Sequence, residues 1–290
     1  MISVMGASGN VGSKVADLLL REEQDVRVFG RSAERLKTFG HRGAEVVVGD
    51  AINVNDLRVL FRGAGAALLV LPEDLTDPNF ISNRSAMSQA ITQAIRDQDV
   101  GHVVLASAVG AYRDQGVGPA AGLQELEGLL FTLDGPHVLS RRAAWYMENL
   151  LANIPMIQEQ GINGSAIKGD HKFPMIATAD VAEGATQHLL SRDFTGHTVE
   201  VVLGPEDVSM IEATRALARV LGISDLPYVE FPPEGVKAAL REMGISEEVA
   251  MLLVEGQIAI NEDRLLGGVE RTLATITATR LDEFLKTVGE

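Results

Sequence analysis

Short β-branched runs and amphipathic helical stretches alternate along the first half of the chain. The strand-like runs lie at 2–5, 26–29, 45–48, 66–71 and 102–106. Helical periodicity fills the intervals, at 11–20, 33–39, 54–61 and 80–97. This alternation predicts an α/β fold with a Rossmann-type, doubly wound parallel sheet, because parallel strands need helical crossovers of this length.

The second half of the chain is less regular. Further strands are expected at 137–140 and 198–204, and a helix at 208–222. A longer helix is expected at 144–160, and Pro155 should bend or interrupt it.

From Tyr228 onward, short helical stretches broken by prolines and glycines indicate a smaller, mostly helical C-terminal substrate lobe. We therefore expect an NAD(P)-binding Rossmann domain over 1–153 and a substrate-binding lobe over 154–290. Part of that lobe, about 172–204, is expected to return to the Rossmann sheet.

Composition narrows the class of protein. The 290 residues are 46% hydrophobic and include no cysteine, so the chain can bury a core but has no disulfides or thiolate chemistry. No basic segment precedes the first apolar run, and the apolar runs are too short to cross a bilayer. We therefore expect a cytoplasmic protein with no membrane partner.

The formal net charge of −15 repels polyanions, so binding to nucleic acid is not expected. A local basic site for one small anion stays open, because a few close contacts outweigh a distant, screened field. The expected partner is a small-molecule substrate, and assembly into a homo-oligomer is left open.

The stretch VMGASGNVGS at 4–13 directly follows the first apolar run and opens the first helical stretch. Gly6, Gly9 and Gly12 would let the backbone turn sharply and approach a pyrophosphate, which the helix N–H groups then face. Ser8 and Asn10 add side-chain donors. A plain strand-to-helix turn is the alternative, but the next motif favours a dinucleotide site.

The second strand ends in VFGRS at 28–32. NAD sites place an acidic residue at this strand end, against the ribose 2′-hydroxyl. Here Arg31 and Ser32 take its place, and a guanidinium fork suits a 2′-phosphate. We therefore predict NADP(H) in preference to NAD(H), the alternative being that Arg31 is only a solvated surface charge.

Other candidates fall at the carboxyl ends of strands, which line the ligand crevice of such sheets. Asp50 and Ala51 follow the third strand, where Asp50 would either accept from the adenine amino group or cap the next helix. Leu71 and Pro72 end the fourth strand, along the expected path of the cofactor ribose.

Taken together, the motifs GASGNVG, VFGRS, VVVGD, LLVLP, LASAVGA and WYMENLL resemble the NmrA-like branch of the atypical short-chain dehydrogenase/reductases. That branch holds NADPH-dependent quinone reductases and triphenylmethane-dye reductases. It also holds NmrA-type redox-sensing regulators, which bind the dinucleotide without turning it over. The resemblance extends over most of the chain and implies the same fold and cofactor.

The resemblance also implies roles for individual residues. Trp145, Tyr146 and Asn149 are expected to border the nicotinamide and the substrate pocket. Cofactor contacts are implied for Gly6, Ser8, Gly9, Asn10, Val11, Arg31, Ser32, Asp50, Leu71, Pro72, Ala106 and Ser107.

The chain departs from this family at two points. Relatives commonly carry Leu-Arg-Pro before the aromatic pair, where this chain has Arg141, Arg142 and Ala143. Some relatives also carry a helix lysine near 120–124, where this chain has Ala-Ala-Gly-Leu-Gln.

The Tyr-x-x-x-Lys pair that exchanges a proton with the substrate in most short-chain dehydrogenases is absent, since no tyrosine has a lysine four residues later. Hydride transfer can proceed without that pair, because the cofactor carries the chemistry and the protein orients it. Ser107 and Tyr112 are the polar residues expected nearest the nicotinamide and are the candidate catalytic residues. An exposed loop tyrosine is the alternative for Tyr112.

Other chemistries find no support. The six histidines lack metal-ligand spacing, so no metal is expected, and neither a P-loop nor a hydrolase nucleophile elbow occurs. We therefore favour an NADPH-dependent oxidoreductase that transfers hydride to a small conjugated carbonyl or quinone. The alternatives are a non-catalytic NADP(H)-binding redox sensor that acts through a protein partner, and a biosynthetic reductase or isomerase.

Overall fold

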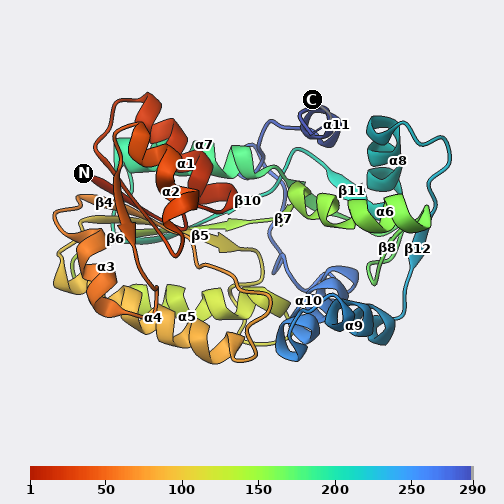
Figure 1. Ribbon diagram of the computed structural model, residues 1–290, viewed down its shortest axis with the longest axis horizontal. Coiled ribbons are helices and arrows are strands. Elements are labelled where there is room, and N and C mark those ends of the chain that lie inside the picture. The colour runs from red at the N-terminus through yellow and green to blue at the C-terminus, as the bar shows by residue number, and fades with distance from the viewer. Residues whose placement is uncertain (289–290) are drawn as a thin grey trace.

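The computed structural model describes residues 1–288 and confirms the α/β class. Seven parallel strands form the main sheet in the order β10-β6-β5-β4-β1-β2-β3 (Figure 1). The strand order reverses between β1 and β4, which is where such sheets open a ligand crevice at their carboxyl edge. The strands are β1 (Ile2–Met5), β2 (Val26–Gly30), β3 (Glu45–Val48), β4 (Ala66–Leu69), β5 (His102–Ala108), β6 (His137–Ala143) and β10 (His197–Val202).

Helices cover both faces of this sheet (Figure 1). One face carries α1 (Asn10–Arg21), α2 (Ala33–His41) and α7 (Thr178–Ser191), and the other carries α3 (Val54–Phe61), α4 (Phe80–Asp97) and α5 (Ala121–Leu130). Neighbouring strand residues alternate between the two cores, as the pleat requires: Val4 packs with the first set of helices and Met5 with the second.

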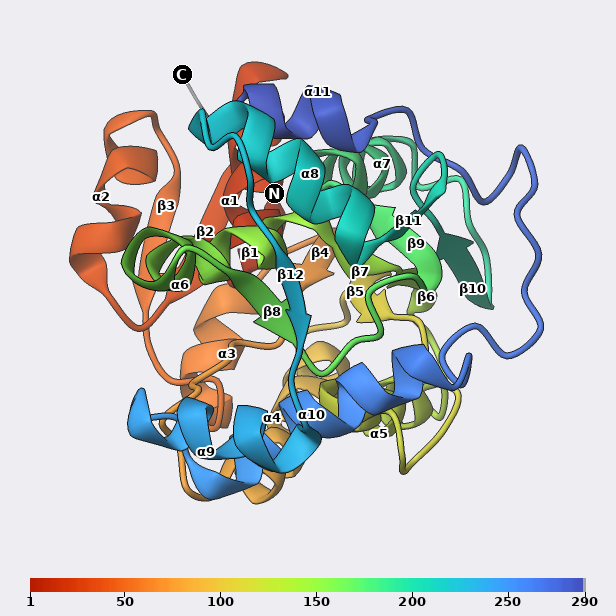
Figure 2. The same cartoon turned by 90° about the vertical axis from the view of Figure 1, so that its right-hand side faces the viewer.

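The C-terminal lobe adds two small sheets and several helices (Figure 2). Its three-stranded sheet comprises β7 (Trp145–Tyr146), β9 (Lys172–Ile176) and β11 (Asp207–Ser209), and its two-stranded sheet pairs β8 (Asn163–Ser165) with β12 (Tyr228–Glu230). The α-helices are α6 (Ile154–Gln160), α8 (Met210–Leu221), α9 (Pro233–Glu242), α10 (Glu247–Asn261) and α11 (Leu281–Lys286), and the 3-10 helices of the chain are η1 (Gly118–Ala120) and η2 (Met147–Asn153).

The helix predicted over 144–160 is wrong in its first half. Trp145 and Tyr146 form β7, which pairs with Met175 and Ile176 of β9, and η2 follows directly. This pairing with a distant strand overrides the local helical pattern. Pro155 lies in the first turn of α6, where its missing N–H breaks no helical hydrogen bond, so it starts a helix instead of bending one.

A charged cluster fastens the edge strand β10 to β6 and α7. Arg141 of β6 is buried, and its Nε donates to Glu200 of β10 at 2.6 Å. His188 of α7 has Nε2 3.6 Å from the Glu200 carboxylate and Nδ1 2.8 Å from that of Asp193. These two carboxylates, Glu200 first, raise the pKa of His188, and His188 followed by Arg141 lowers the pKa of Glu200 to about 2.

We expect His188→Gln to destabilise the protein more at about pH 5.5 than at about pH 9. The folded protein raises the pKa of His188 above its ordinary value of 6.5, so the charged imidazole stabilises the fold below that value. This stabilisation is lost as the pH rises through the folded-state pKa. Urea unfolding of both proteins at the two pH values measures the difference, and an equal loss at both would contradict the ionic role.

Candidate cofactor and substrate site

The loop of residues 6–9 lies at the carboxyl end of β1 and leads directly into α1. Gly6 has φ +75°, a conformation that strains other residues, and a Cβ there would lie 2.9 Å from Cβ of Val70. A Cβ on Gly12 would lie only 2.3 Å from the carbonyl oxygen of Gly6. The fold itself therefore requires glycine at both positions.

Gly9 is different, because the packing of the protein does not require it. Its φ of −98° and ψ of 175° suit any residue, and the nearest atom to an added Cβ is the Gly6 oxygen at 3.4 Å. Gly9 is also exposed. Glycine here leaves the backbone open to close approach from outside, as a bound pyrophosphate needs.

The N-terminus of α1 keeps its hydrogen-bond donors free. No side-chain oxygen anywhere in residues 1–288 accepts from the first-turn N–H groups that begin at Asn10. Because a helix start carries a partial positive charge, this unfilled end is suited to an anion.

Four of the other helices that flank the sheet, α2, α3, α4 and α7, have a side-chain acceptor at their start, and so does η1, which leads into α5. Ser32 accepts from the N–H of Arg35 in α2, and Asn53 from that of Asn55 in α3. Three glutamates from elsewhere in the chain serve the remainder: Glu248 accepts from Ile81 N–H of α4, Glu255 from Gly118 N–H of η1 before α5, and Glu148 from Thr178 N–H of α7. Within the described chain, α5 has no such acceptor of its own but continues from η1, so α1 is the helix whose first turn lacks both an acceptor and a capped preceding turn.

Arg31 follows β2, the strand next to β1, and is exposed. Its Nη1 is 3.0 Å from the Asp74 carboxylate, which follows β4. Ser8 also reaches this strand end, since its Oγ would lie 3.6 Å from a Cβ on Gly30. Ser32 caps α2, so its oxygen is already an acceptor while its proton remains available.

Asp50 does not cap the next helix. Its Oδ1 accepts from the N–H of Ile52 at 3.1 Å, and Asn53 is the cap of α3. The helix-cap alternative for Asp50 is therefore wrong, while its contact with adenine stays a prediction. Ala51, which follows β3, and Leu71, which follows β4, are buried, and Pro72 is half-buried.

Ser107 is buried at the end of β5 and faces away from α1. Its hydroxyl donates to Glu127 of α5 at 2.5 Å. The same carboxylate is paired with Arg142 of β6, whose Nη2 lies 2.5 Å from Oε2 and Nε 3.1 Å from Oε1. The Ser107 proton is therefore committed to a buried ion pair on the α5 side of the sheet.

The three tyrosines differ in what their hydroxyls contact. Tyr112 donates to the Arg264 carbonyl at 2.6 Å, and Tyr228 donates to the Ile167 carbonyl at 2.7 Å. The half-buried Tyr146 makes no hydrogen bond through its hydroxyl with any residue in 1–288. Burial, followed by the carboxylates of Glu73 and Glu148, raises the pKa of Tyr146.

A small cavity of about 100 Å³ opens between the sheet and the C-terminal lobe. The Trp145 ring stands edge-on to Phe173 there, with ring centroids 5.7 Å apart. Val109, which follows β5, Ile260 of α10, and Leu265 and Leu266 complete an apolar lining, and Lys172, Asp207 and Asp263 are the charged residues. Asn149 is exposed and does not line this cavity.

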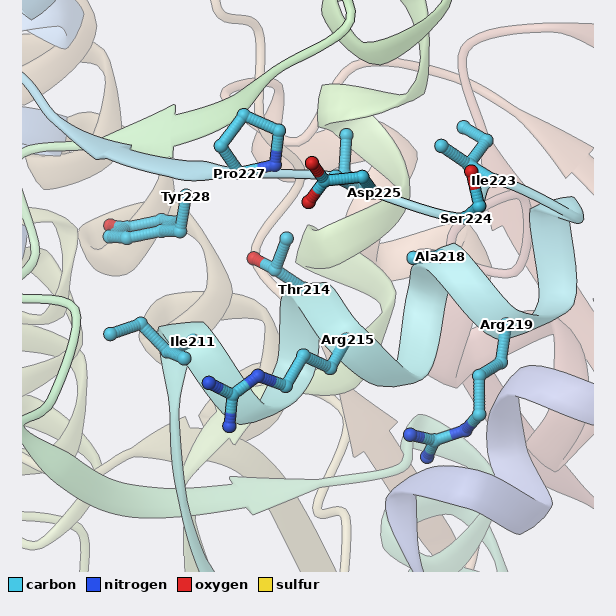
Figure 3. Close-up of a pocket in the computed structure, with 11 residues that line it drawn as sticks. Ile211, Thr214, Arg215, Ala218, Arg219, Ile223, Ser224, Asp225, Pro227 and Tyr228 are labelled. Atoms are coloured by element: carbon cyan, nitrogen blue, oxygen red, sulfur yellow. The ribbon is translucent and has the colours of Figure 1, made fainter.

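A larger pocket of about 580 Å³ lies between α8 and the segment 223–228 (Figure 3). All of its lining residues fall within 211–228, and Arg215 and Arg219 of α8 are the basic ones. No strand of the main sheet contributes to it. Since α8 lies at the end of the molecule away from that sheet (Figure 1), this pocket is separate from the glycine loop.

The chain is similar to known proteins in sequence and in fold. Residues 6–130 match a family model described as NAD(P)H-binding. This region is therefore similar to NAD(P)H-binding domains. An NAD(P)H azoreductase of Xenophilus azovorans is 27% identical over 297 residues, which cover 99% of the chain and 97% of that relative.

Solved structures share the fold of the whole chain. The NADPH-dependent quinone oxidoreductase QOR2 of Escherichia coli, complexed with NADPH, has a TM-score of 0.81 at 20% identity, with both chains covered in full. Citrobacter sp. triphenylmethane reductase complexed with NADP(H) scores 0.80 at 19% identity over 99% of each chain. NmrA, a negative transcriptional regulator in complex with NADP, scores 0.68 at 16% over 99% of this chain and 90% of that one.

These matches confirm the resemblance to NmrA-like atypical short-chain dehydrogenase/reductases and support an NAD(P)H-dependent oxidoreductase. Within residues 1–288, no helix combines the length and apolar character needed to cross a bilayer.

We expect Gly9→Ala and Gly12→Ala to separate cofactor binding from folding. Gly9→Ala should retain wild-type stability but weaken dinucleotide binding at least about tenfold, because the new methyl group makes only an ordinary contact with the Gly6 oxygen yet stands at the exposed helix start that the pyrophosphate would approach. Gly12→Ala should destabilise the protein by about 1–3 kcal/mol through overpacking against Gly6.

Thermal unfolding and titration with NADPH measure the two effects on the same samples. Loss of stability in Gly9→Ala, or full binding by it, would contradict the role of Gly9.

Proposed function

We propose that this chain is an NADPH-dependent oxidoreductase that reduces a small conjugated carbonyl or quinone. The observation that carries the proposal is the open start of α1. No side-chain acceptor from residues 1–288 reaches it, whereas α2, α3, α4 and α7 each have one. An anion would be stabilised there, and a dinucleotide pyrophosphate would satisfy both the helix end and the exposed Gly9 backbone.

The names of the relatives support the class of substrate. They are an azoreductase, a quinone oxidoreductase and a triphenylmethane reductase, whose named substrates are all conjugated electron acceptors. The cavity beside Trp145 and Phe173 has apolar and charged lining residues, and its two aromatic side chains would pack favourably against a flat conjugated ring.

The residues present fit NADPH, and several of them would hold it. Gly9 and the first turn of α1 would hold the pyrophosphate, and Arg31 with Ser32 the 2′-phosphate. Asp50 and Ala51 would contact the adenosine, and Leu71, Pro72 and Ala106 the ribose and nicotinamide side. When bound, NADPH supplies a hydride.

Tyr146 is the residue we propose as hydrogen-bond donor to the substrate oxygen. Its hydroxyl makes no hydrogen bond with residues 1–288, and a phenol is protonated at neutral pH, so it can donate to an oxygen that gains negative charge. For Tyr112 to serve instead, its contact with the Arg264 carbonyl would have to break, and Ser107 would have to leave Glu127.

We expect Arg31→Ala to weaken NADPH binding by about 1–3 kcal/mol, the cost of a lost charge-assisted contact, and to leave NADH binding unchanged. Calorimetric titration with each cofactor measures this. Arg58→Ala is the matched control, since Arg58 also pairs with an exposed carboxylate, that of Asp97 at the end of α4. An equal loss for both cofactors would refute the assignment to the 2′-phosphate.

We expect steady NADPH oxidation with members of a quinone panel, and Tyr146→Phe to lower kcat at least about tenfold with little change in NADPH affinity. Tyr228→Phe is the control, because its hydroxyl is held within the lobe.

Wild-type rates in Tyr146→Phe would remove Tyr146 from the mechanism. Tight NADPH binding without turnover of any member of the panel would instead favour the redox-sensing regulator.

A further inference from the structure

The Arg31–Asp74 ion pair joins two strands that are not neighbours. Arg31 follows β2 and Asp74 follows β4, and β1 lies between these two strands. The guanidinium therefore reaches across the carboxyl end of β1, where the glycine loop begins at Gly6. This is the edge at which the cofactor has to enter.

Asp74 is the fixed partner in this pair. Its Oδ1 accepts from the N–H of Thr76 at 3.1 Å and from the Thr76 hydroxyl at 2.7 Å, which leaves Oδ2 for Arg31. The hydrogen bonds from Thr76 and then Arg31 lower the pKa of Asp74, so the carboxylate is charged at neutral pH. The long Arg31 side chain is therefore the mobile member that reaches toward Asp74.

We propose that Asp74 limits the preference for NADPH over NADH by competing with the 2′-phosphate for Arg31. This inference rests on the proposed function. In the structure the Arg31 guanidinium is held toward β4, whereas the adenosine ribose is expected on the side of β2 and β3. A 2′-phosphate has to draw Arg31 away from Asp74, but NADH makes no such demand.

The exposure of the two side chains limits how strongly Asp74 can compete with a 2′-phosphate for Arg31. The side chains of Arg31 and Asp74 are 57% and 42% exposed, so solvent screens their attraction. An exposed ion pair of this kind corresponds to a change in affinity of about two- to fivefold. Asp74 therefore adjusts the selectivity without reversing it.

The test uses Asp74→Asn in the full chain. The amide keeps an acceptor oxygen for Thr76 but removes the charge that holds Arg31. Calorimetric titration at low salt should show NADPH binding tightened about two- to fivefold and NADH binding unchanged. In an Arg31→Ala background the same substitution should give no gain in NADPH affinity, because the contested guanidinium is gone.

Asp97→Asn is the matched control. Asp97 pairs with Arg58 through an exposed contact, but lies at the C-terminal end of α4, away from the carboxyl edge of the sheet. It should change neither affinity.

An unchanged or weakened affinity of Asp74→Asn for NADPH, or an equal gain for both cofactors, would overturn the competition while leaving the proposed function intact. If the wild-type protein binds neither dinucleotide, the proposed function fails, and this inference fails with it.

Discussion

The contact between the start of α1 and the end of β1 is the constraint on which the site depends. Gly12 packs on the Gly6 carbonyl more closely than any side chain would allow, and Gly6 adopts a conformation that glycine tolerates best. Together they place the first turn of α1 at the carboxyl edge of the sheet, where the strand order reverses between β1 and β4. Arg31 follows β2, the strand next to β1. Its proposed contact with a 2′-phosphate depends on where that helix end holds the rest of the dinucleotide.

Most of the sheet could be predicted from the sequence, because buried parallel strands and amphipathic helices leave different periods in the chain. The region 144–160 could not. Its short apolar stretch pairs as a strand with Met175 and Ile176, some thirty residues later, and no local pattern encodes such a partner. By contrast, the glycine loop could be predicted from the sequence, because its geometry depends on residues that are close together in the chain.

The side-chain contacts of the candidate site could not be predicted from the sequence. Ser107 donates to Glu127, 20 residues away, and Arg31 to Asp74, 43 residues away. Tyr112 donates to a carbonyl 152 residues away. Each contact uses a donor that composition and position alone would leave free for a substrate. Tyr146 gains importance for the same reason, since its hydroxyl is the tyrosine hydroxyl that tertiary structure leaves uncommitted in the described chain.

Two glutamates of α10 connect the C-terminal lobe to helices that flank the main sheet. Glu248 and Glu255 are seven residues apart, two turns along one helical face, and they fill the starts of α4 and η1. The same helix supplies Ile260 to the cavity wall. Widening that cavity by moving α10 would therefore break both helix caps at once. The position of this cavity wall is therefore coupled to the starts of α4 and η1.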